Sequence, residues 1–116
     1  MASETSELLR GTLPTLVLSI LQSQSLYGYE IAKEIRQRTG SVLHLKEGSL
    51  YPALHAMERD GVLAGKWRTV ERGPSRKYYR LTAKGRAVLA KRRSQWQRFR
   101  DAVDRVVGAE SQEVPA

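Results

Sequence analysis

The sequence contains no cysteine and very little histidine. Its 116 residues include only two histidines, His44 and His55, so disulfides and thiolate metal sites are excluded. Two histidines without suitably spaced carboxylates do not make a zinc site either. Paired carboxylates, a Ser-His-Asp set and a glycine-rich phosphate loop are also missing. We therefore expect neither an enzyme nor a protein that holds a metal or another cofactor.

Long hydrophobic runs are missing as well. The longest, from Leu13 to Leu21, is interrupted by Thr15 and Ser19, and it is shorter than the roughly 20 residues that cross a bilayer. Residues 1–7 are polar and acidic, unlike a signal peptide. We therefore expect a cytoplasmic protein without a membrane partner, and the length of 116 residues is that of a single domain.

Acidic residues are scarce in one part of the chain. Between Lys66 and Arg100, thirteen lysines or arginines accompany one acid, Glu71, which gives this part a net charge of +12. The whole chain carries +8, so the remainder carries about −4. Charge segregated in this way is typical of a surface that binds a polyanion. Nucleic acid is the most common such partner and a membrane surface is the second, while a solvated basic surface is the alternative without a partner.

Hydrophobic periodicity predicts two helices at the beginning of the chain. The first covers Leu8 to Gln22, and its regular part should begin near Thr12 because Pro14 is tolerated only in a first turn. The second helix runs from Tyr27 to about Arg38. Residues 42–46 then form a short extended segment.

A third helix is predicted from Ser49 to Asp60. Ser49 is the expected N-cap, Pro52 would lie in the first turn, and Gly61 would adopt the left-handed conformation that ends many helices. The side of this helix near its N-terminus that faces away from the core carries small, polar and aromatic residues. The core-facing stripe, with its i, i+4 and i+7 spacing, consists of Leu50, Leu54 and Met57.

A basic hairpin should follow the third helix. Strands are predicted at Val62 to Arg68 and at Arg76 to Leu81, joined by a Gly-Pro turn. Alternation along the second strand places Arg76 and Lys77 on opposite faces and puts one of the two following tyrosines in the core. Helices followed by a basic hairpin compose a winged helix-turn-helix. The cations of the hairpin are Lys66, Arg68, Arg72, Arg76, Lys77 and Arg80.

The last predicted helix runs from Ala83 to Val107, with Thr82 as its N-cap. A helix of about 25 residues is about 37 Å long and extends beyond the small domain before it. Its apolar residues follow a heptad pattern interrupted by Arg92, so we expect it to pair with the same helix of a second copy. The predicted dimer seam consists of Leu89, Trp96, Phe99, Val103 and Val106.

Together these elements predict a mainly α fold with a small β-hairpin (α+β). The winged helix-turn-helix domain would occupy residues 8–82 and the dimerisation helix residues 83–107. Residues 1–7 and 108–116 would be flexible termini.

Three motifs in this order resemble the PadR-type transcriptional regulators of the shorter subfamily, and the resemblance runs from about Leu8 to Val107. It implies a dimeric winged-helix repressor on a pseudo-palindromic operator, with a C-terminal helix that dimerises and packs against the partner's first helix. Some shorter members bind flat aromatic or drug-like molecules in the dimer interface. Pro14 departs from the family in the first helix. The motifs are Tyr27-Gly28-Tyr29-Glu30, then Gly48-Ser49-Leu50-Tyr51-Pro52-Ala53-Leu54 with Glu58-Arg59-Asp60-Gly61, then Arg72-Gly73-Pro74-Ser75-Arg76-Lys77-Tyr78-Tyr79-Arg80-Leu81-Thr82 with Gly85.

The candidate DNA contacts lie in the third helix, at its approach and in the hairpin. A hydroxyl, a phenol and the amides of a helix start can bond phosphates or base edges, although Ser49 could only cap the helix and Tyr51 could only pack on the hairpin. Tyr27 matches a family position close to DNA, although its role could be limited to packing against the start of its own helix. Lys46 could be an ordinary solvated lysine. Arg72, at the loop tip, is free to enter a minor groove. The predicted contacts are Tyr27, Lys46, Gly48, Ser49, Leu50, Tyr51, Arg72, Arg76, Lys77 and Tyr78.

Trp96 in the seam has two interpretations. With Phe99 and Val103 it could line a pocket for a small aromatic effector, or the seam could be filled without a ligand. The predicted function is a sequence-specific DNA-binding transcriptional regulator, a repressor that such an effector releases. Two other classes remain open, namely a winged-helix module that binds an acidic protein, and an aromatic-ligand-binding protein with secondary DNA affinity.

Overall fold

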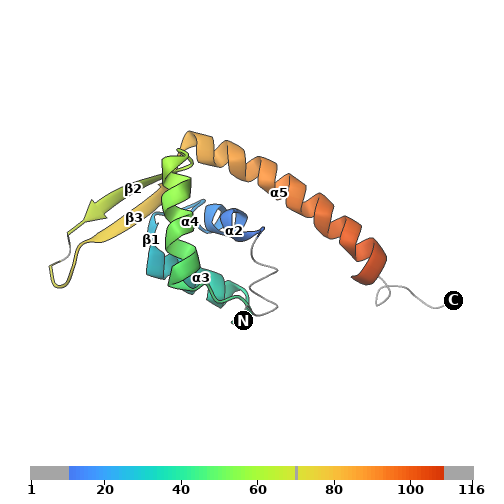
Figure 1. Cartoon of the computed structure of the whole chain (residues 1–116), viewed down its shortest axis with the longest axis horizontal. Helices are drawn as coiled ribbons and strands as arrows, with labels where there is room; N and C mark the ends of the chain where they lie inside the picture. Colours follow the sequence, from blue (N-terminus) through green and yellow to red (C-terminus); the bar gives the residue numbers. More distant parts are fainter. Residues whose placement is uncertain (1–10, 70, 109–116) are drawn as a thin grey trace.

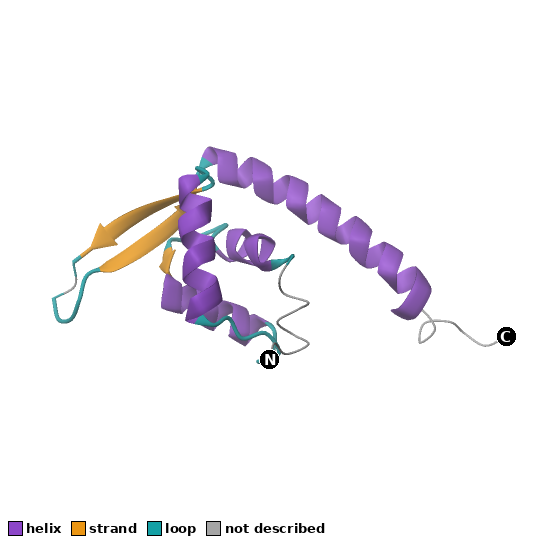
Figure 2. Cartoon of the chain, viewed as in Figure 1, coloured by secondary structure: helices purple, strands orange, loops and turns teal. Residues whose placement is uncertain are grey.

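The structure of the protein is a computed structural model, and it describes residues 11–69 and 71–108. Helices make up most of these residues, and strands contribute a small sheet (Figure 2). In chain order the elements are α2 (Leu13–Ile20), β1 (Leu26–Tyr27), α3 (Gly28–Arg38), α4 (Glu47–Arg59), β2 (Leu63–Arg68), β3 (Arg76–Leu81), α5 (Ala83–Val103) and the π-helical turn η1 (Asp104–Gly108).

The helices α2, α3 and α4 pack together beside a three-stranded antiparallel sheet of order β1-β3-β2. The β2–β3 hairpin projects from one side of this unit and α5 from the other (Figure 1). The radius of gyration is 16.7 Å, whereas a compact chain of this length has about 13 Å. The projecting α5 explains the excess. The mainly α winged helix with a long C-terminal helix is therefore confirmed.

Hydrophobic side chains from every helix and strand of this unit form one core. The stripe predicted for the third helix is buried as expected, and α5 contributes from its first turns only. None of the helices in the described ranges is long and apolar enough to span a membrane. The buried members of the core are Val17, Leu18, Ile20, Leu21, Leu26, Ile31, Ile35, Leu50, Leu54, Met57, Val62, Leu63, Tyr79, Leu81 and Leu89.

Two predicted helix ends are confirmed. Pro14 lies in the first turn of α2, where its missing amide interrupts no helical hydrogen bond; the predicted start at Leu8 lies outside the described residues. Gly61 adopts φ +81° just beyond α4. Its amide and that of Val62 donate to the carbonyls of Glu58 and Met57, both at 3.0 Å, which is the bonding pattern of a Schellman C-cap.

The predicted start of the third helix was wrong. Helix α4 begins at Glu47 with Lys46 as its N-cap residue, because the Leu50 amide already donates to the Lys46 carbonyl at 2.9 Å. An acidic residue in the first turn also suits the positive end of the helix dipole. Ser49 is therefore not the cap, and Pro52 lies inside the helix.

The strand assignments need two corrections. Residues 42–46 form no strand, and the hairpin instead gains the two-residue strand β1. Its residues Leu26 and Tyr27 pair with Tyr79 and Tyr78 of β3. Pairing with β1 satisfies the edge of β3 that β2 leaves open, but a two-residue strand is too short to produce an alternating pattern.

The end of α4 is tied directly to the start of α5. Thr82 caps α5 by accepting a hydrogen bond from the Gly85 amide at 3.0 Å, as predicted, and its hydroxyl also donates to the Gly61 carbonyl at 2.6 Å. Lys84 donates to the Asp60 carbonyl at 2.7 Å. At Gly85 a Cβ atom would collide with the Val62 carbonyl, so only glycine permits this approach. The predicted helix to residue 107 ends at Val103 as an α-helix, and η1 continues it to Gly108.

Candidate nucleic-acid interface

The first turn of α4 is open to solvent. Lys46, Glu47, Gly48 and Ser49 are all exposed, so their backbone amides and side chains can reach a ligand. Leu50, which the sequence included among the DNA contacts, is only 2% exposed and belongs to the core. Leu50 belongs to the i, i+4, i+7 stripe on the buried side of α4, so its side chain points away from any DNA groove.

Tyr51 packs against the start of α3. A Cβ atom at Gly28 would lie 2.6 Å from Cε1 of Tyr51 and 2.8 Å from its hydroxyl oxygen. Gly28 therefore lets the two helices approach closely with the half-buried phenol between them. The structure therefore differs from the alternative in which Tyr51 packs only on the hairpin.

The hairpin face that looks toward α4 is held by an ion pair. Nζ of Lys77 lies 2.6 Å from Oε1 of Glu58 on α4, and it also lies 5.5 Å from the ring centre of Tyr79 and 5.9 Å from that of Trp67. The hydrogen bond to Glu58 raises the pKa of Lys77. A Cβ atom at Gly65 would collide with Cε of Lys77 and lie 2.9 Å from Oε2 of Glu58, so glycine leaves room for the pair.

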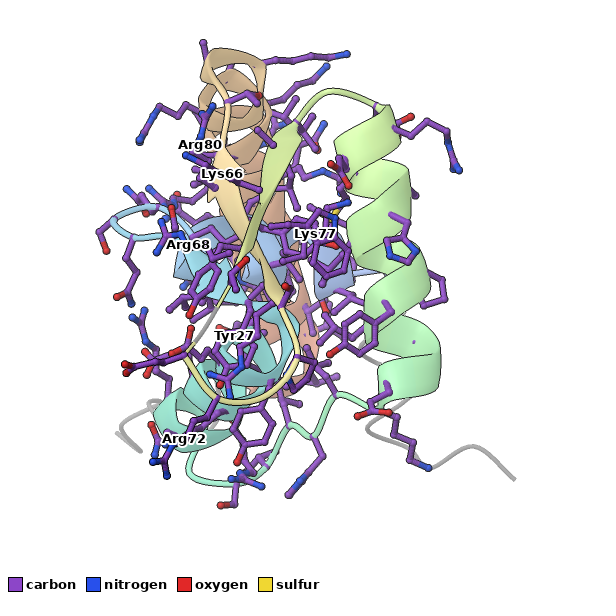
Figure 3. All side chains as sticks on the ribbon, turned by 90° about the vertical axis from the view of Figure 1, so that its left-hand side faces the viewer. Tyr27, Lys66, Arg68, Arg72, Lys77 and Arg80 are labelled. Atoms are coloured by element: carbon purple, nitrogen blue, oxygen red, sulfur yellow. The ribbon has the colours of Figure 1, made fainter. Side chains whose placement is uncertain are left out.

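The opposite face of the hairpin carries arginines on tyrosine rings. Arg68 lies over the ring of Tyr78 at 4.3 Å, and Arg76 lies over the ring of Tyr27 at 4.6 Å. The rings of Tyr27 and Tyr78 meet edge to face at 5.4 Å. Lys77 lies on the side of the hairpin toward α4, whereas Arg68, Lys66 and Arg80 lie on the other side (Figure 3). The predicted separation of Arg76 from Lys77 is therefore confirmed.

Most cations of the hairpin have no acidic partner in the part of the chain that the structure describes. Within residues 11–69 and 71–108 the ion pairs are Arg38–Glu34, Lys77–Glu58 and Arg100–Asp101. Lys77 is thus the one hairpin cation in a described ion pair. The exposed, positively charged remainder consists of Lys66, Arg68, Arg72, Arg76 and Arg80.

The C-terminal helix carries an exposed apolar stripe. The exposed fractions are 41% for Trp96, 62% for Phe99, 38% for Val103 and 82% for Val106, and the rings of Trp96 and Phe99 lie 6.1 Å apart. Leu89 differs, because it is 3% exposed and packs in the core of its own chain. Its assignment to the dimer seam was therefore wrong, and the exposed stripe begins at Trp96.

An open groove of about 950 Å³ runs between α5 and α2. Trp96, Phe99 and Val103 line it from α5, and Thr15 and Leu16 line it from α2. The three residues that the sequence proposed for effector binding therefore face one common space.

The sequence profile of the PadR-like family of transcriptional regulators matches residues 17–91. These residues cover the winged helix-turn-helix and the first turns of α5. The chain belongs to the PadR-like family. An uncharacterized protein of Lysinibacillus sphaericus is 33% identical over 99 residues, which are 85% of this chain and 91% of that protein.

Solved structures of transcriptional regulators have the same fold. A transcriptional regulator from Clostridium thermocellum is 30% identical with a TM-score of 0.81, and the match covers 88% of this chain and 99% of that one. Bacillus subtilis PadR, crystallised in complex with operator DNA, is 24% identical with a TM-score of 0.64, covering 69% of this chain and 45% of that one. At this identity the second similarity shows a common fold.

Two residues of the candidate interface were not singled out in the sequence analysis. Glu58, the partner of Lys77, stood only as part of a motif, and Arg68 only as one of six hairpin cations. A sequence signal exists for Arg68, because pairing the two strands symmetrically about the turn sets it opposite Arg76, as observed. Glu58 has no such signal, since the side chain joins two elements nineteen residues apart.

Proposed function

We propose that the chain is a homodimeric repressor that binds duplex DNA with the first turn of α4 in the major groove and the hairpin on the adjacent backbone. The observation that supports it is that the exposed start of α4 lies in the same domain as the basic hairpin. Except for Lys77, the hairpin cations have no acidic partner among the described residues. A helix start attracts phosphate through its free amides and dipole. The same fold in Bacillus subtilis PadR was crystallised with operator DNA, which makes duplex DNA the first ligand to test.

Within this interface, the predicted contacts around the start of α4 and at the tip of the hairpin have different tasks. Lys46, Gly48 and Ser49 are proposed to meet phosphates or base edges, and Tyr51 contributes its hydroxyl from between α3 and α4. Arg72 at the loop tip is exposed and is proposed to enter the minor groove, where negative potential favours arginine.

A second copy of the chain is the proposed cover for the apolar stripe of α5. Four consecutive seam residues from Trp96 to Val106 are exposed to a degree that is unusual for a monomer. Pairing α5 with a second α5 would bury them and set the two α4 helices at a fixed separation. Half-sites about one turn of DNA apart, roughly 34–36 Å, or a multiple of it, are then expected.

The groove beside Trp96 is the proposed effector site. Its aromatic residues Trp96 and Phe99 suit a flat aromatic or drug-like molecule held between the chain and its second copy. The contact of α5 with the end of α4 through Thr82 and Lys84 offers a route by which an effector that spreads the seam would move α4.

Gel-shift titration of the full chain tests DNA binding. A promoter fragment and a random duplex are compared between 50 and 200 mM salt. If a dimer neutralises six to ten phosphates, its affinity should fall by about 10³ to 10⁵ over this range. A flat response to salt, or no binding to either duplex, would leave the protein-interaction module as the better proposal.

Sequence reading and effector binding need their own measurements. Replacing Ser49 by Ala should cost promoter affinity more than random-duplex affinity, and equal losses would assign α4 a scaffolding role. Effector binding is followed by Trp96 fluorescence in a Trp67→Phe background with a panel of planar aromatic compounds. Quenching that also releases the promoter supports an effector, whereas no quenching across the panel supports a filled seam.

A further inference from the structure

We propose that the hairpin face opposite α4 is a preorganised binding surface for DNA phosphates, on which Tyr27 and Tyr78 hold arginines in place and do not themselves contact DNA. The two arginines are Arg76 and Arg68. Arg68 is a phosphate contact beyond those predicted from the sequence. This inference rests on the proposed DNA binding, and its test separates the two.

The strand register brings the four side chains together. Arg68 pairs with Arg76 across the hairpin, and Tyr78 pairs with Tyr27 across β3 and β1. Arg76 and Tyr78 are two residues apart on β3, so they share a face. Each guanidinium carbon lies less than 5 Å from a tyrosine ring centre, at 4.3 Å for Arg68 and 4.6 Å for Arg76.

This arrangement is unfavourable for the free protein. Two like charges directly opposite each other destabilise a pair of strands, and neither arginine has a described carboxylate partner. The ring faces offset part of the repulsion, because the tyrosine quadrupole attracts a cation. A polyanion bound between the two guanidinium groups would offset the remaining repulsion.

Phosphate fits the groups that remain free. A guanidinium that lies on a ring still has N–H groups at its edge, and its planar fork matches two oxygens of a phosphate. Because the ring already fixes the long side chain, less conformational freedom is lost when a phosphate binds. The arginines are both exposed, and they form the last strand pair before the loop that carries Arg72. The DNA backbone next to the half-site is therefore the proposed occupant.

The test separates ring from hydroxyl. An operator selected from a random duplex library is titrated with the full chain at several salt concentrations. Tyr78→Phe keeps the ring and should bind within about twofold of the parent, whereas Tyr78→Leu removes the platform and should bind about three- to tenfold more weakly. If the phenol itself contacts DNA, the phenylalanine variant will lose as much as the leucine variant, and the proposal is overturned.

The charge is tested at Arg68. The slope of log K against log salt is negative, and each lost phosphate contact makes it shallower by about 0.9. Arg68→Gln should therefore make it shallower by roughly 2 for a dimer, in which the contact is lost twice. Arg68→Lys keeps the charge and the slope but should still bind more weakly, because lysine lacks the planar fork. Lys91→Gln, at an exposed position on α5, removes the same charge and should leave the slope unchanged.

The outcomes are distinct. An unchanged slope and affinity in Arg68→Gln would overturn the phosphate surface while the operator still binds. Failure of the parent protein to bind any duplex would instead remove the proposed function. Thermal unfolding of each variant identifies losses of affinity that are due to misfolding. If Arg68→Gln or Tyr78→Leu does not fold, the conservative variants Arg68→Lys and Tyr78→Phe still test the proposal.

Discussion

The two faces of strand β3 use similar residues for different purposes. Tyr79 and Lys77 face α4, where the phenol is 2% exposed and the amine is paired with Glu58. Tyr78 and Arg76 face the other way, where a half-buried ring meets Tyr27 and the guanidinium is exposed. Each aromatic–cation pair is one residue away from the other along the chain.

This comparison separates cations that hold the protein together from cations that are available to a ligand. Lys77 has a carboxylate at 2.6 Å, so its charge is largely compensated before any DNA arrives. Arg76 lies on an aromatic ring and has no carboxylate partner among the described residues, so its charge is available to a ligand. A count of basic residues treats the two as equal, although only one adds to the net positive charge of the interface.

The largest expected difference between the faces is in stability. Replacing the buried Tyr79 by Ala should lower the free energy of unfolding by about 3–5 kcal/mol, a large share of the roughly 5–15 kcal/mol that holds a domain folded. Replacing Tyr78 by Ala should cost about 1 kcal/mol, because its ring is only half-buried and lies outside the core. Chemical denaturation followed by circular dichroism measures both. Equal losses would mean that the two faces are not distinct in packing.

Replacing Glu58 should have a smaller effect, on operator affinity. Its sign depends on whether Lys77 holds the hairpin against α4 or contacts DNA. If the Lys77–Glu58 pair holds the hairpin against α4, Glu58→Gln should lower operator affinity by about two- to fivefold, since a partly exposed ion pair contributes up to about 1 kcal/mol. If Lys77 contacts DNA instead, the same change frees its charge and should raise affinity. Gel-shift titration with operator and random duplex measures the sign.

Two further variants control this experiment. Glu47→Gln removes an acid from the exposed first turn of α4 and should raise affinity for both duplexes alike. Gly65→Ala disturbs the pair without changing charge, because the added methyl group would lie where Cε of Lys77 now lies and close to Oε2 of Glu58. It should therefore lower operator affinity in the same direction as Glu58→Gln, and a neutral result would argue against the role of the pair.

The sequence predicted the alternation along β3 correctly because it is a local property of a strand. The burial of Tyr79, the opposite placement of Arg76 and Lys77, and the cap at Thr82 all follow from period and residue type. The partner of Lys77 could not be predicted in this way. It depends on how closely α4 approaches the hairpin, which Gly65 decides through the space it leaves.

Other errors have the same origin in long-range contacts. Leu89 fits the heptad of α5 as well as Trp96 does, but the core of the winged helix covers it first. Ser49 is a better cap residue than Lys46, yet the helix begins earlier, since cap preferences are weaker than the hydrogen bonds that extend a helix. The placement of Tyr51 against Gly28 likewise depends on the distance between α3 and α4.

The smallest expected difference between the faces appears at alkaline pH. The hydrogen bond to Glu58 raises the pKa of Lys77 above its ordinary 10.5. Burial raises the pKa of Tyr79 above its ordinary 10.0, although the charge of Lys77 opposes this. In the unfolded chain both groups lose their protons at the ordinary values, before the folded chain does. Both contributions are therefore complete below about pH 10 and are lost as the pH rises through the folded pKa values.

Thermal unfolding of Lys77→Met and Tyr79→Phe between pH 8 and 11 measures this loss. The stability difference between the parent and Lys77→Met should be constant to about pH 9.5 and then shrink, because the parent loses the charge that the variant never had. Tyr79→Phe should likewise flatten the alkaline decline. Arg76→Gln on the other face should leave it unchanged, since a guanidinium keeps its proton throughout this range. A difference that stays constant to pH 11 in Lys77→Met would show that the Lys77–Glu58 pair contributes nothing to the folded state.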